Sequence, residues 1–441
     1  MSKCRPLDRT EQAMEMMNDR ASSLNVVTIS RISGSLTPQV LTKALLLVQS
    51  RHPRLNTRII RKLNSLYFES GIIDLPLNIV TVSRNEGWQK VALREFNQKI
   101  ESDKYLARFT FIQIEEDKSD NYLIATIHHG ITDGLSSVQL HSEILKSCQK
   151  VISGEDIDET NNLDILPSVT ELIPNSLTGL VSQTKSILFL LKLKFRDLLY
   201  KPESLGFEEY VPISLRSAGM VHKQLQPEIT QHLINISRRE STTVQGALTA
   251  GILKAVATKI NQIKNEKDTK PVCLSCQTYI DLRKRLQPEI KNENLGILVS
   301  FINLCHTVEK SQLFWDIARN IKQKLELYLT KNDIFYAVLT SKFVTEYYLS
   351  HPKEPPVSIV ITNIGKVNIP QNYGTLKLEE ISFVPVQSAF GGVFGVAVST
   401  FNEKMFLNFM FSKPSISQET AEEIANETLK NLTEACFSEV N

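Results

Sequence analysis

Apolar residues recur at helical spacing in the stretch GSLTPQVLTKALLLVQSRHPRL, residues 34–55. Thr37 is suited to cap the amino end of a helix, and Pro38 is suited to its first position. The dipeptide His52-Pro53 is typical of a helix end, because the residue before a proline disfavours helical backbone. We therefore predict a helix from about Pro38 to Ser50.

Two further segments, YLARFTFIQIEED at 105–117 and NYLIATIHH at 121–129, alternate between apolar and polar residues or are continuously apolar. The turn-forming stretch DKSDN, residues 117–121, lies between them, so the pattern predicts a β-hairpin. His128 and His129 then fall at the end of its second strand. After Gly134, apolar residues again recur at helical intervals, which predicts a junction of strand, loop and helix.

The composition changes in the middle of the chain. Residues 166–212 contain four prolines, Pro167, Pro174, Pro202 and Pro212, which interrupt regular secondary structure. Within it, KSILFLLKLKFRDLLY at 185–200 predicts a basic amphipathic helix. We predict an N-terminal lobe at 1–175, a crossover linker at 176–212 and a C-terminal lobe at 213–441. A helix lying on a membrane surface has similar chemistry. The absence of a lipidation motif favours packing on the protein itself.

The second half mixes the two kinds of element. Residues 241–260 and 415–437 have helical patterns, whereas PVCLSCQTYIDL at 271–282, VSIVITNI at 357–364 and MFLNFMFS at 405–412 have the pattern of strands. No regular alternation of strand and helix is present in either half. The pattern favours α+β lobes over a doubly wound sheet.

Composition narrows the classes of partner. The 441 residues are 42% apolar and 22% charged, which is typical of a folded globular chain of about two to three domains. Lys and Arg number 50 and Asp and Glu 48, so the summed charge favours neither nucleic acid nor an anionic surface. The amino terminus has no signal-peptide pattern and no stretch is long and apolar enough for a transmembrane segment, so we expect a cytoplasmic protein.

The six cysteines are scattered, and a reducing compartment keeps such residues as thiols. Cys273 and Cys276 form one close pair within a strand-like segment. A metal or redox site would need a second pair of ligands or a turn into a helix. We interpret both residues as structural thiols and expect no bound metal.

His128, His129 and Asp133 are the candidate chemical residues. Histidine accepts and returns a proton near neutral pH, so a histidine at a strand end is suited to general-base catalysis. A pair of packed, hydrogen-bonded histidines is the plainer interpretation. A metal site is a third, although adjacent strand residues point to opposite faces and bind one ion poorly together. The serines of DGLSSVQL, residues 133–140, resemble a phosphopantetheine attachment loop, but such loops belong to compact helical modules.

Taken as a whole, HHGITDG at 128–134 has the form His-His-x-x-x-Asp-Gly and resembles the signature of the coenzyme-A-dependent acyltransferase superfamily. This superfamily includes chloramphenicol acetyltransferase, condensation domains, alcohol O-acetyltransferases and polyketide-associated acyltransferases. The resemblance extends along the chain, in order and spacing, through RPLDRTEQAMEMM at 5–17, YIDLRKRLQPEIKNENLGILVS at 279–300 and VSIVITNIGKVNIPQNYG at 357–374. The Asp-Phe-Gly-Trp-Gly motif of the plant branch is absent, which favours the condensation, alcohol-acylating or polyketide-associated branches.

The resemblance implies an α+β fold of two chloramphenicol-acetyltransferase-like lobes, with mixed sheets, flanking helices and an active-site tunnel between the lobes. It implies that His129 is the general base and that His128 supports it. It also implies that Asp133 pairs with Arg283, with Arg285 as the alternative, and that Gly134 permits close approach of the donor or a positive φ. Thr362 and Asn363 are the candidates for oxyanion or substrate binding.

The function implied is that of a freestanding acyltransferase, which moves an acyl group from an acyl-CoA or acyl-carrier-protein thioester to an alcohol and forms an ester. The thioester is a co-substrate, and no bound cofactor is expected. The expected partners are an acyl carrier protein in trans and a small-molecule or lipid alcohol, without nucleic acid. Two alternatives stay open: an amide-forming condensation enzyme with an amine acceptor, and a noncatalytic homologue that binds a carrier or a lipid.

Overall fold

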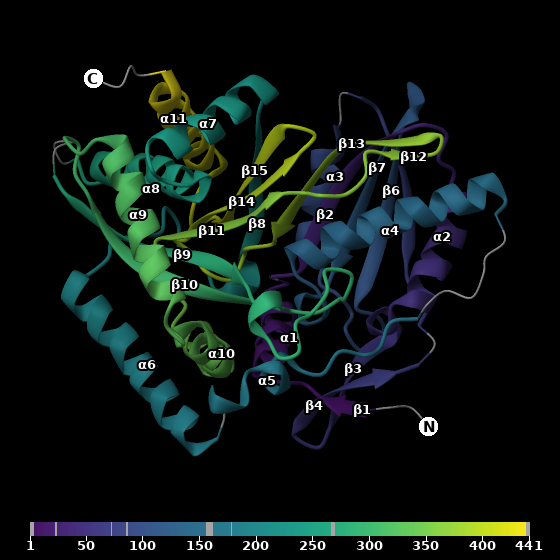
Figure 1. The fold of residues 1–441 in the computed structure, drawn as a ribbon, viewed down its shortest axis with the longest axis horizontal. Coiled ribbons are helices and arrows are strands. Elements are labelled where there is room, and N and C mark those ends of the chain that lie inside the picture. Colours follow the sequence, from purple (N-terminus) through teal and green to yellow (C-terminus); the bar gives the residue numbers. More distant parts are fainter. Residues whose placement is uncertain are drawn as a thin grey trace. The chain divides into compact units, whose positions relative to one another are not determined.

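The chain forms two compact units (Figure 1). The computed structural model describes residues 4–22, 24–71, 73–84, 87–155, 162–177, 179–265 and 270–437. Unit 1 comprises Met1–Pro174, Leu282–Val299 and Lys366–Val386, and unit 2 comprises Asn175–Asp281, Ser300–Gly365 and Gln387–Asn441.

This division differs from the predicted one in three segments. The predicted crossover linker, residues 176–212, lies within unit 2. The predicted N-terminal lobe, 1–175, ends where the chain first leaves unit 1, but residues 282–299 and 366–386 return to unit 1 from within the predicted C-terminal lobe, 213–441. The second of these two returning segments adds two strands to the sheet of unit 1, and the first carries Arg283. Pairing between residues so far apart leaves no local pattern that a sequence could reveal.

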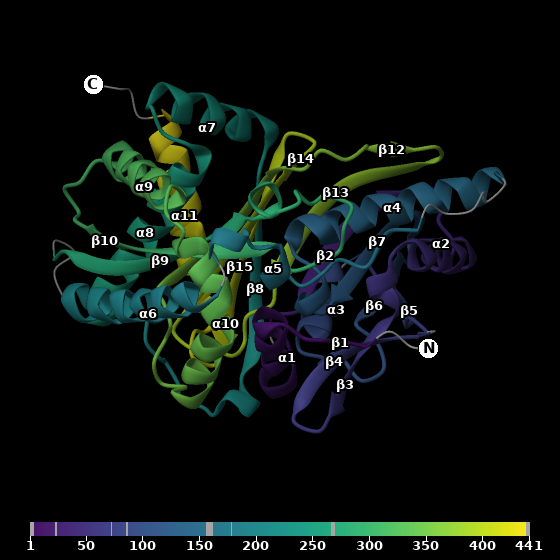
Figure 2. The same ribbon diagram turned by 60° about the horizontal axis from the view of Figure 1, so that its bottom comes forward.

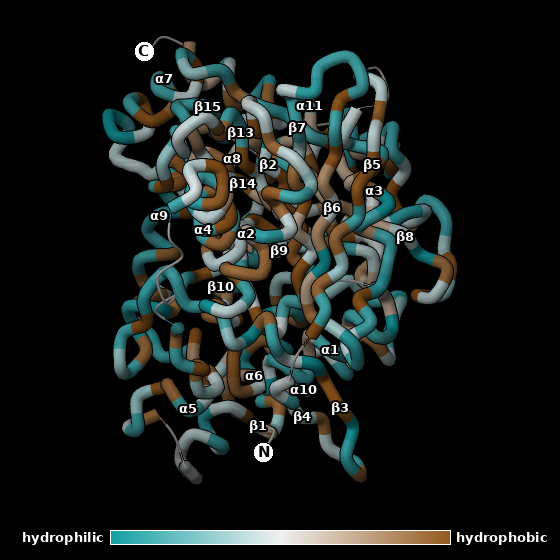
Figure 3. Tube along the Cα trace, turned by 90° about the vertical axis from the view of Figure 1, so that its right-hand side faces the viewer, coloured by the Kyte–Doolittle hydropathy of each residue, from teal (hydrophilic) through white to brown (hydrophobic). Residues whose placement is uncertain are grey.

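The main sheet of unit 1 has six described strands in the order β12-β13-β2-β7-β6-β5. They are β2 (Val26–Ser33), β5 (Leu77–Val82), β6 (Ala107–Ile114), β7 (Asp117–Ile127), β12 (Asn372–Tyr373) and β13 (Leu376–Pro385). The β5–β6 pair is parallel, whereas the remaining neighbours are antiparallel. The first five residues of β2 and the first six of β6 are all buried, so both faces of these strands are covered. Figure 3 colours the trace of the chain by the hydropathy of each residue.

Helices flank this sheet: α1 (Arg9–Ala21), α2 (Pro38–Arg51), α3 (Gly87–Phe96) and α4 (Gly134–Ser153). The helix predicted at Pro38–Ser50 is confirmed as α2, and its Thr37 Oγ1 accepts a hydrogen bond from the Val40 N–H at 3.3 Å. Helix α4 packs against α2, β2 and β13, and α3 packs against β2 and β7.

The predicted hairpin is present, but its turn was placed wrongly. The strands β6 and β7 are separated by Glu115 and Glu116, and the stretch DKSDN lies within β7. Its last two residues pair with β2, with Ser33 opposite Asp120 and Ile32 opposite Asn121, and Asp117 pairs with Ile114 of β6. Strand pairing therefore overrides the turn propensity of these polar residues.

Unit 2 is built on a second six-stranded sheet, in the order β10-β9-β11-β14-β15-β8. Its described strands are β8 (Ser217–Leu225), β9 (Val272–Asp281), β10 (Val299–Val308), β11 (Ile359–Lys366), β14 (Phe394–Phe401) and β15 (Lys404–Lys413). Its helices are α6 (Leu180–Tyr200), α7 (Pro227–Arg239), α8 (Val244–Ile263), α9 (Phe314–Leu329), α10 (Asp333–Ser350) and α11 (Gln418–Phe437). Two mixed sheets with flanking helices confirm the predicted α+β class.

The cysteines in the described part of the chain are free thiols. Cys276 is buried, which raises its pKa to about 12, and Cys273 is half-buried. No group of three or more His, Cys, Asp or Glu residues suited to hold a metal occurs among the residues described. None of the described helices is long and apolar enough to cross a membrane.

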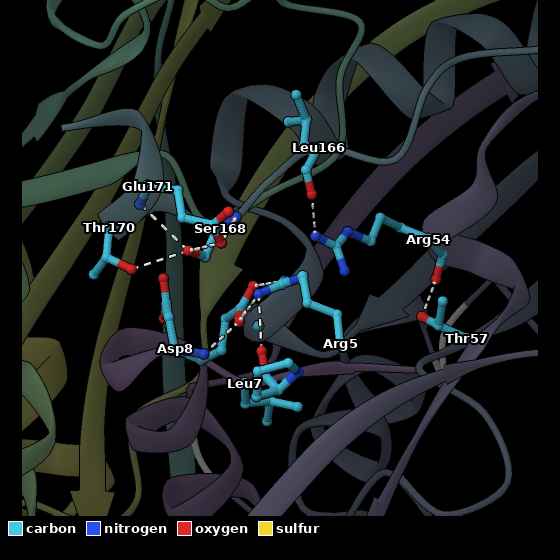
Figure 4. A network of polar contacts seen from close by, with 12 residues as sticks. Arg5, Leu7, Asp8, Arg54, Thr57, Leu166, Ser168, Thr170 and Glu171 are labelled. Atoms are coloured by element: carbon cyan, nitrogen blue, oxygen red, sulfur yellow. Dashed lines mark hydrogen bonds and ion pairs between the residues drawn. The ribbon is translucent and has the colours of Figure 1, made fainter. Parts of the chain in front are cut away.

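Groups of polar contacts in unit 1 involve the start of α1, the start of a short helix further along the chain and Arg54 (Figure 4). Asp8 caps α1, because its Oδ1 accepts the Glu11 N–H at 2.8 Å while Glu11 Oε2 accepts the Asp8 N–H at 2.8 Å. Arg5 donates to the same Glu11 carboxylate from two nitrogens. Nearby, Ser168 caps the short helix α5 (Val169–Leu172), and Arg54 donates to the Leu166 carbonyl at 2.6 Å.

Asp8 is the weak point of these contacts at neutral pH. Burial and the neighbouring Glu11 carboxylate raise its pKa to about 6, despite the Glu11 N–H and Arg5, which act in the opposite direction. A carboxyl whose pKa is higher in the folded state stabilises the fold when protonated. That contribution is complete below the ordinary pKa of 3.8 and is lost as the pH rises through about 6.

We predict that Asp8→Asn stabilises the protein at pH 8. Asparagine keeps the helix cap and removes the buried charge, so the free energy of unfolding should rise by on the order of 1 kcal/mol at pH 8 and change little at pH 4. Urea unfolding of both proteins at the two pH values measures this difference. An equal change at both values would contradict the assignment.

Candidate active site

The candidate residues lie where β7 gives way to α4. Strand β7 ends at Ile127, a short 3₁₀ turn spans His129–Ile131, and α4 begins at Gly134. The His128 N–H still bonds to the Leu106 carbonyl, and the residues that follow turn away from the sheet. Asp133 then starts the helix as its N-cap.

His128 is fully buried and held at both ring nitrogens. The Gly130 N–H, which can only donate, lies 3.0 Å from Nδ1, so Nδ1 accepts. The ring proton therefore sits on Nε2, which donates to Glu15 Oε2 at 3.0 Å. Because both nitrogens are engaged, His128 is an anchor between the turn and α1. Its predicted supporting role is compatible with this position and stays a prediction.

His129 has the opposite arrangement of its ring proton. Its Nδ1 lies 2.7 Å from the Thr132 carbonyl oxygen, which can only accept, so the proton sits on Nδ1. The Nε2 lone pair is left to act as a base. Burial lowers the pKa of His129, although the Thr132 carbonyl and the Asp133 charge oppose this effect. The residue as a whole is partly exposed, and the lowered pKa keeps the ring neutral at neutral pH.

Asp133 is buried, with 1% of its surface exposed, and uses both carboxylate oxygens within unit 1. Its Oδ1 accepts the Ser136 N–H at 2.8 Å and an Arg283 nitrogen at 2.9 Å, and its Oδ2 accepts the Leu298 N–H at 3.2 Å. Burial raises the pKa of this carboxyl, but Arg283 and the two N–H groups outweigh burial and hold the pKa below its usual value. The carboxylate is therefore permanently charged at neutral pH.

Arg283, and not the exposed Arg285, is the partner that the structure gives to Asp133. The Arg283 guanidinium also donates to Ser136 Oγ at 2.7 Å, and Ser136 Oγ donates to the Asn294 carbonyl at 3.2 Å. The returning segment, residues 282–299, is thus bound to the first turn of α4 at three of its residues: Arg283, Asn294 and Leu298.

Gly134 is required for close packing. A Cβ atom at this position would lie 2.6 Å from a ring carbon of Phe383, which is buried on β13. Gly134 is not among the residues with a positive φ, so the expectation of a positive φ was wrong. The close approach shown here is to Phe383, and an approach to an acyl donor stays a prediction.

Thr362 and Asn363 lie on β11 in unit 2. The Asn363 side-chain oxygen accepts the Gly365 N–H at 2.8 Å, where Gly365 has a φ of 69°. This bond shapes the end of β11. The predicted role of Thr362 and Asn363 in binding an oxyanion or a substrate stays a prediction.

Sequence reasoning missed Glu15, Ser136 and Phe383. Glu15 lies within RPLDRTEQAMEMM, which we matched to the superfamily as an opening helix without assigning its acidic residues. A carboxylate on a helix gives no signal that a histidine 113 positions away is its partner. Ser136 is easier to predict from the sequence, because the side chain of an N-cap residue accepts the N–H of the residue three positions later.

Comparison with known proteins identifies the class. Residues 11–164 match the family description "Condensation domain", and residues 215–410 match "Phthiocerol/phthiodiolone dimycocerosyl transferase C-terminus". No curated protein sequence matches the chain.

Several solved structures have the same fold. Polyketide synthase associated protein 5 from Mycobacterium tuberculosis is 13% identical with a TM-score of 0.73, and the match covers 99% of each chain. Trichothecene 15-O-acetyltransferase from Fusarium sporotrichioides is 11% identical with a TM-score of 0.77, over 98% of this chain and 96% of that one. The first condensation domain of the CDA synthetase is 11% identical with a TM-score of 0.71, over 99% and 97%.

The architecture is therefore that of the two-lobed, chloramphenicol-acetyltransferase-like enzymes, as the sequence resemblance implied. The two family matches fall in succession along the chain and together account for most of it. The first half of the chain is thus similar to condensation domains, and the second half is similar to the C-terminal part of the dimycocerosyl transferases.

We predict that Asp133→Ala destabilises the fold strongly. Removal of one partner leaves the Arg283 guanidinium buried without its counter-charge, so the free energy of unfolding should fall by about 3–5 kcal/mol. Urea unfolding measures this loss. As a matched control, Asp19→Ala removes an exposed carboxylate paired with Lys99 and should cost less than about 1 kcal/mol. Equal losses for the two variants would contradict a structural role for Asp133.

We also predict that Gly134→Ala destabilises unit 1 by about 1–3 kcal/mol, because the new methyl group overlaps the Phe383 ring. Gly71→Ala is the matched control, since a Cβ at Gly71 meets nothing within 4 Å. Thermal unfolding of both variants distinguishes them. Adding Phe383→Leu to Gly134→Ala should recover part of the loss, and a Gly134→Ala protein as stable as the Gly71→Ala protein would disprove the packing argument.

Proposed function

We propose that this protein transfers an acyl group from an acyl-CoA or acyl-carrier-protein thioester to an alcohol and forms an ester, with His129 as the general base. The observation that carries the proposal is the hydrogen bond from His129 Nδ1–H to the Thr132 carbonyl. It leaves Nε2 of this partly exposed residue unprotonated.

In the proposed reaction, the acceptor hydroxyl attacks the thioester carbonyl carbon while His129 Nε2 takes its proton. A carbon–oxygen bond forms, and the carbonyl oxygen carries the negative charge. When the tetrahedral intermediate collapses, the carbon–sulfur bond breaks and the imidazolium returns the proton to the thiolate. Atoms and charge balance without an acyl-enzyme. Thr362 and Asn363 are the proposed groups that bind the oxyanion or the substrate.

The environment of His129 suits this role. A base must be neutral before it accepts a proton, and burial lowers the pKa of His129, which keeps the ring neutral at neutral pH. The Thr132 carbonyl fixes the tautomer and the orientation of the ring, and it also stabilises the imidazolium that forms during the reaction. Asp133 and Arg283 are positioning residues in this scheme, because their charged groups bond to each other and to the start of α4.

The alcohol acceptor is supported by the similarity to a protein described as a trichothecene 15-O-acetyltransferase. The condensation-domain match over residues 11–164 favours the second candidate, in which an amine attacks and an amide forms. The same histidine serves both reactions. In either case the thioester is a co-substrate, and an acyl carrier protein is the proposed partner for a carrier-bound donor.

We predict that His129→Ala lowers the rate of acyl transfer by at least about 10²-fold and leaves the fold intact. Release of free thiol from acyl-CoA and from an acylated carrier protein, each with alcohol or amine acceptors, measures the rate. His351→Ala is the matched control, because the His351 ring also bonds to a backbone carbonyl through Nδ1 but is exposed in unit 2.

The two variants separate the alternatives. Loss of transfer in His129→Ala with full activity in His351→Ala supports the general base. Equal transfer by the wild type and His129→Ala would remove the catalytic assignment. A wild type that binds a carrier or a lipid but transfers no acyl group would favour the noncatalytic homologue.

A further inference from the structure

Helix α6 (Leu180–Tyr200) has two apolar faces, and only one of them is used by its own unit. On the inner face, Phe189 is 8% exposed and packs with Tyr336 and Ala337 of α10. Lys192 forms an ion pair with Asp333 at 2.5 Å, and Arg196 donates to the Asn303 carbonyl at 2.7 Å. Figures 1 and 2 both show α6 running along the outside of unit 2 beside α10. The inner face is thus explained by packing within the unit.

The outer face of α6 is equally apolar but faces solvent. Six of its described apolar side chains are exposed: Ile187 (59%), Leu188 (59%), Leu191 (58%), Phe195 (66%), Leu198 (69%) and Leu199 (64%). Four of them, Leu188, Leu191, Phe195 and Leu198, follow one another at spacings of three and four residues and so form one stripe. The buried Phe189 lies on the opposite side of the helix. We call these six residues the outer stripe.

Basic side chains border the outer stripe on both sides. With 3.6 residues per turn, Lys194 and Lys201 lie along one border, and Lys185 and Lys192 lie along the other. All four lysines are exposed. Residues 180–201 contain five basic residues against one acidic residue, Asp197, whose carboxylate bonds to the neighbouring Arg196. The positive charge is therefore local to this helix, although the whole chain is almost neutral.

We propose that the outer stripe docks the protein on the surface of an anionic lipid bilayer, with α6 lying along that surface. Leucine and phenylalanine side chains enter the boundary of the acyl chains, while the long side chains of Lys185, Lys194 and Lys201 extend to the lipid phosphates. Lys192 is paired with Asp333 and is not needed for this contact. Lysines that lie close to a membrane surface attract a negatively charged leaflet. If two copies of the protein paired through the outer stripe, the lysines of one copy would face the lysines of the other and repel them. The charge pattern therefore favours lipid over self-association. The proposal is independent of the acyl-transfer proposal, since it concerns binding alone.

Sedimentation of the full chain with lipid vesicles tests the proposal. The probes are vesicles of phosphatidylcholine alone and vesicles of phosphatidylcholine mixed with phosphatidylserine. Wild type should sediment with the mixed vesicles, and the triple variant Leu191→Asp, Phe195→Asp and Leu198→Asp should bind them at least about tenfold more weakly. The matched control places aspartate at three exposed apolar positions outside α6, namely Leu63 (97%), Leu215 (69%) and Leu313 (68%), and should bind as wild type does.

A second variant tests the charge. Lys185→Glu, Lys194→Glu and Lys201→Glu together should abolish the preference for vesicles that contain phosphatidylserine, and added salt should weaken wild-type binding. Thermal unfolding verifies that every variant is folded. Wild type that binds neither kind of vesicle, or an outer-stripe variant that binds like wild type, would overturn the proposal. So would a wild-type dimer without lipid binding that the outer-stripe variant converts to a monomer, because the stripe would then be an interface between copies.

Discussion

The ion pair between Asp133 and Arg283 is the interaction on which the candidate site depends. Both side chains are 1% exposed, and the carboxylate also caps α4 and accepts the Leu298 N–H. A single buried group thereby determines where α4 begins and where the returning segment, residues 282–299, lies. Buried pairs of this kind add little net stability, because desolvation offsets the attraction. Their effect is geometric, since any other arrangement leaves a charge unpaired.

The geometry matters because His129 is four residues before this anchor. The backbone between β7 and Asp133 must turn within a few residues, and the turn brings the Thr132 carbonyl to His129 Nδ1. In His128 the roles are reversed: the Gly130 N–H donates to Nδ1, so the ring proton lies on the other nitrogen. Two adjacent, chemically identical side chains thus become an anchor and a candidate base. The backbone group that contacts each Nδ1 decides which nitrogen carries the proton, and Glu15 holds the protonated Nε2 of His128.

Much of this could be predicted from the sequence, but only where the signal is local or the motif is specific. The α2 boundaries follow from Thr37, Pro38 and His52-Pro53, and HHGITDG together with YIDLRKR identified Asp133 and Arg283, which are 150 positions apart. The turn at Glu115 and Glu116 was misplaced because pairing with β2 outweighs turn propensity. Glu15 and Phe383 contact the site through tertiary packing, for which a single sequence contains no pattern.

Helix α6 is a second case in which the sequence alone does not decide between two interpretations. Its sequence predicts a basic amphipathic helix, and two interpretations, packing on the protein or lying on a membrane, have similar periodicity. The structure shows that the two interpretations do not exclude each other. Phe189 and Arg196 bind one side to unit 2, while the outer stripe and its bordering lysines are exposed. A helix that packs on one side needs polar residues on the other to remain in water, and α6 instead has leucine and phenylalanine there. That excess of apolar surface, held on a rigid unit, is the physical reason to look for a lipid surface opposite it.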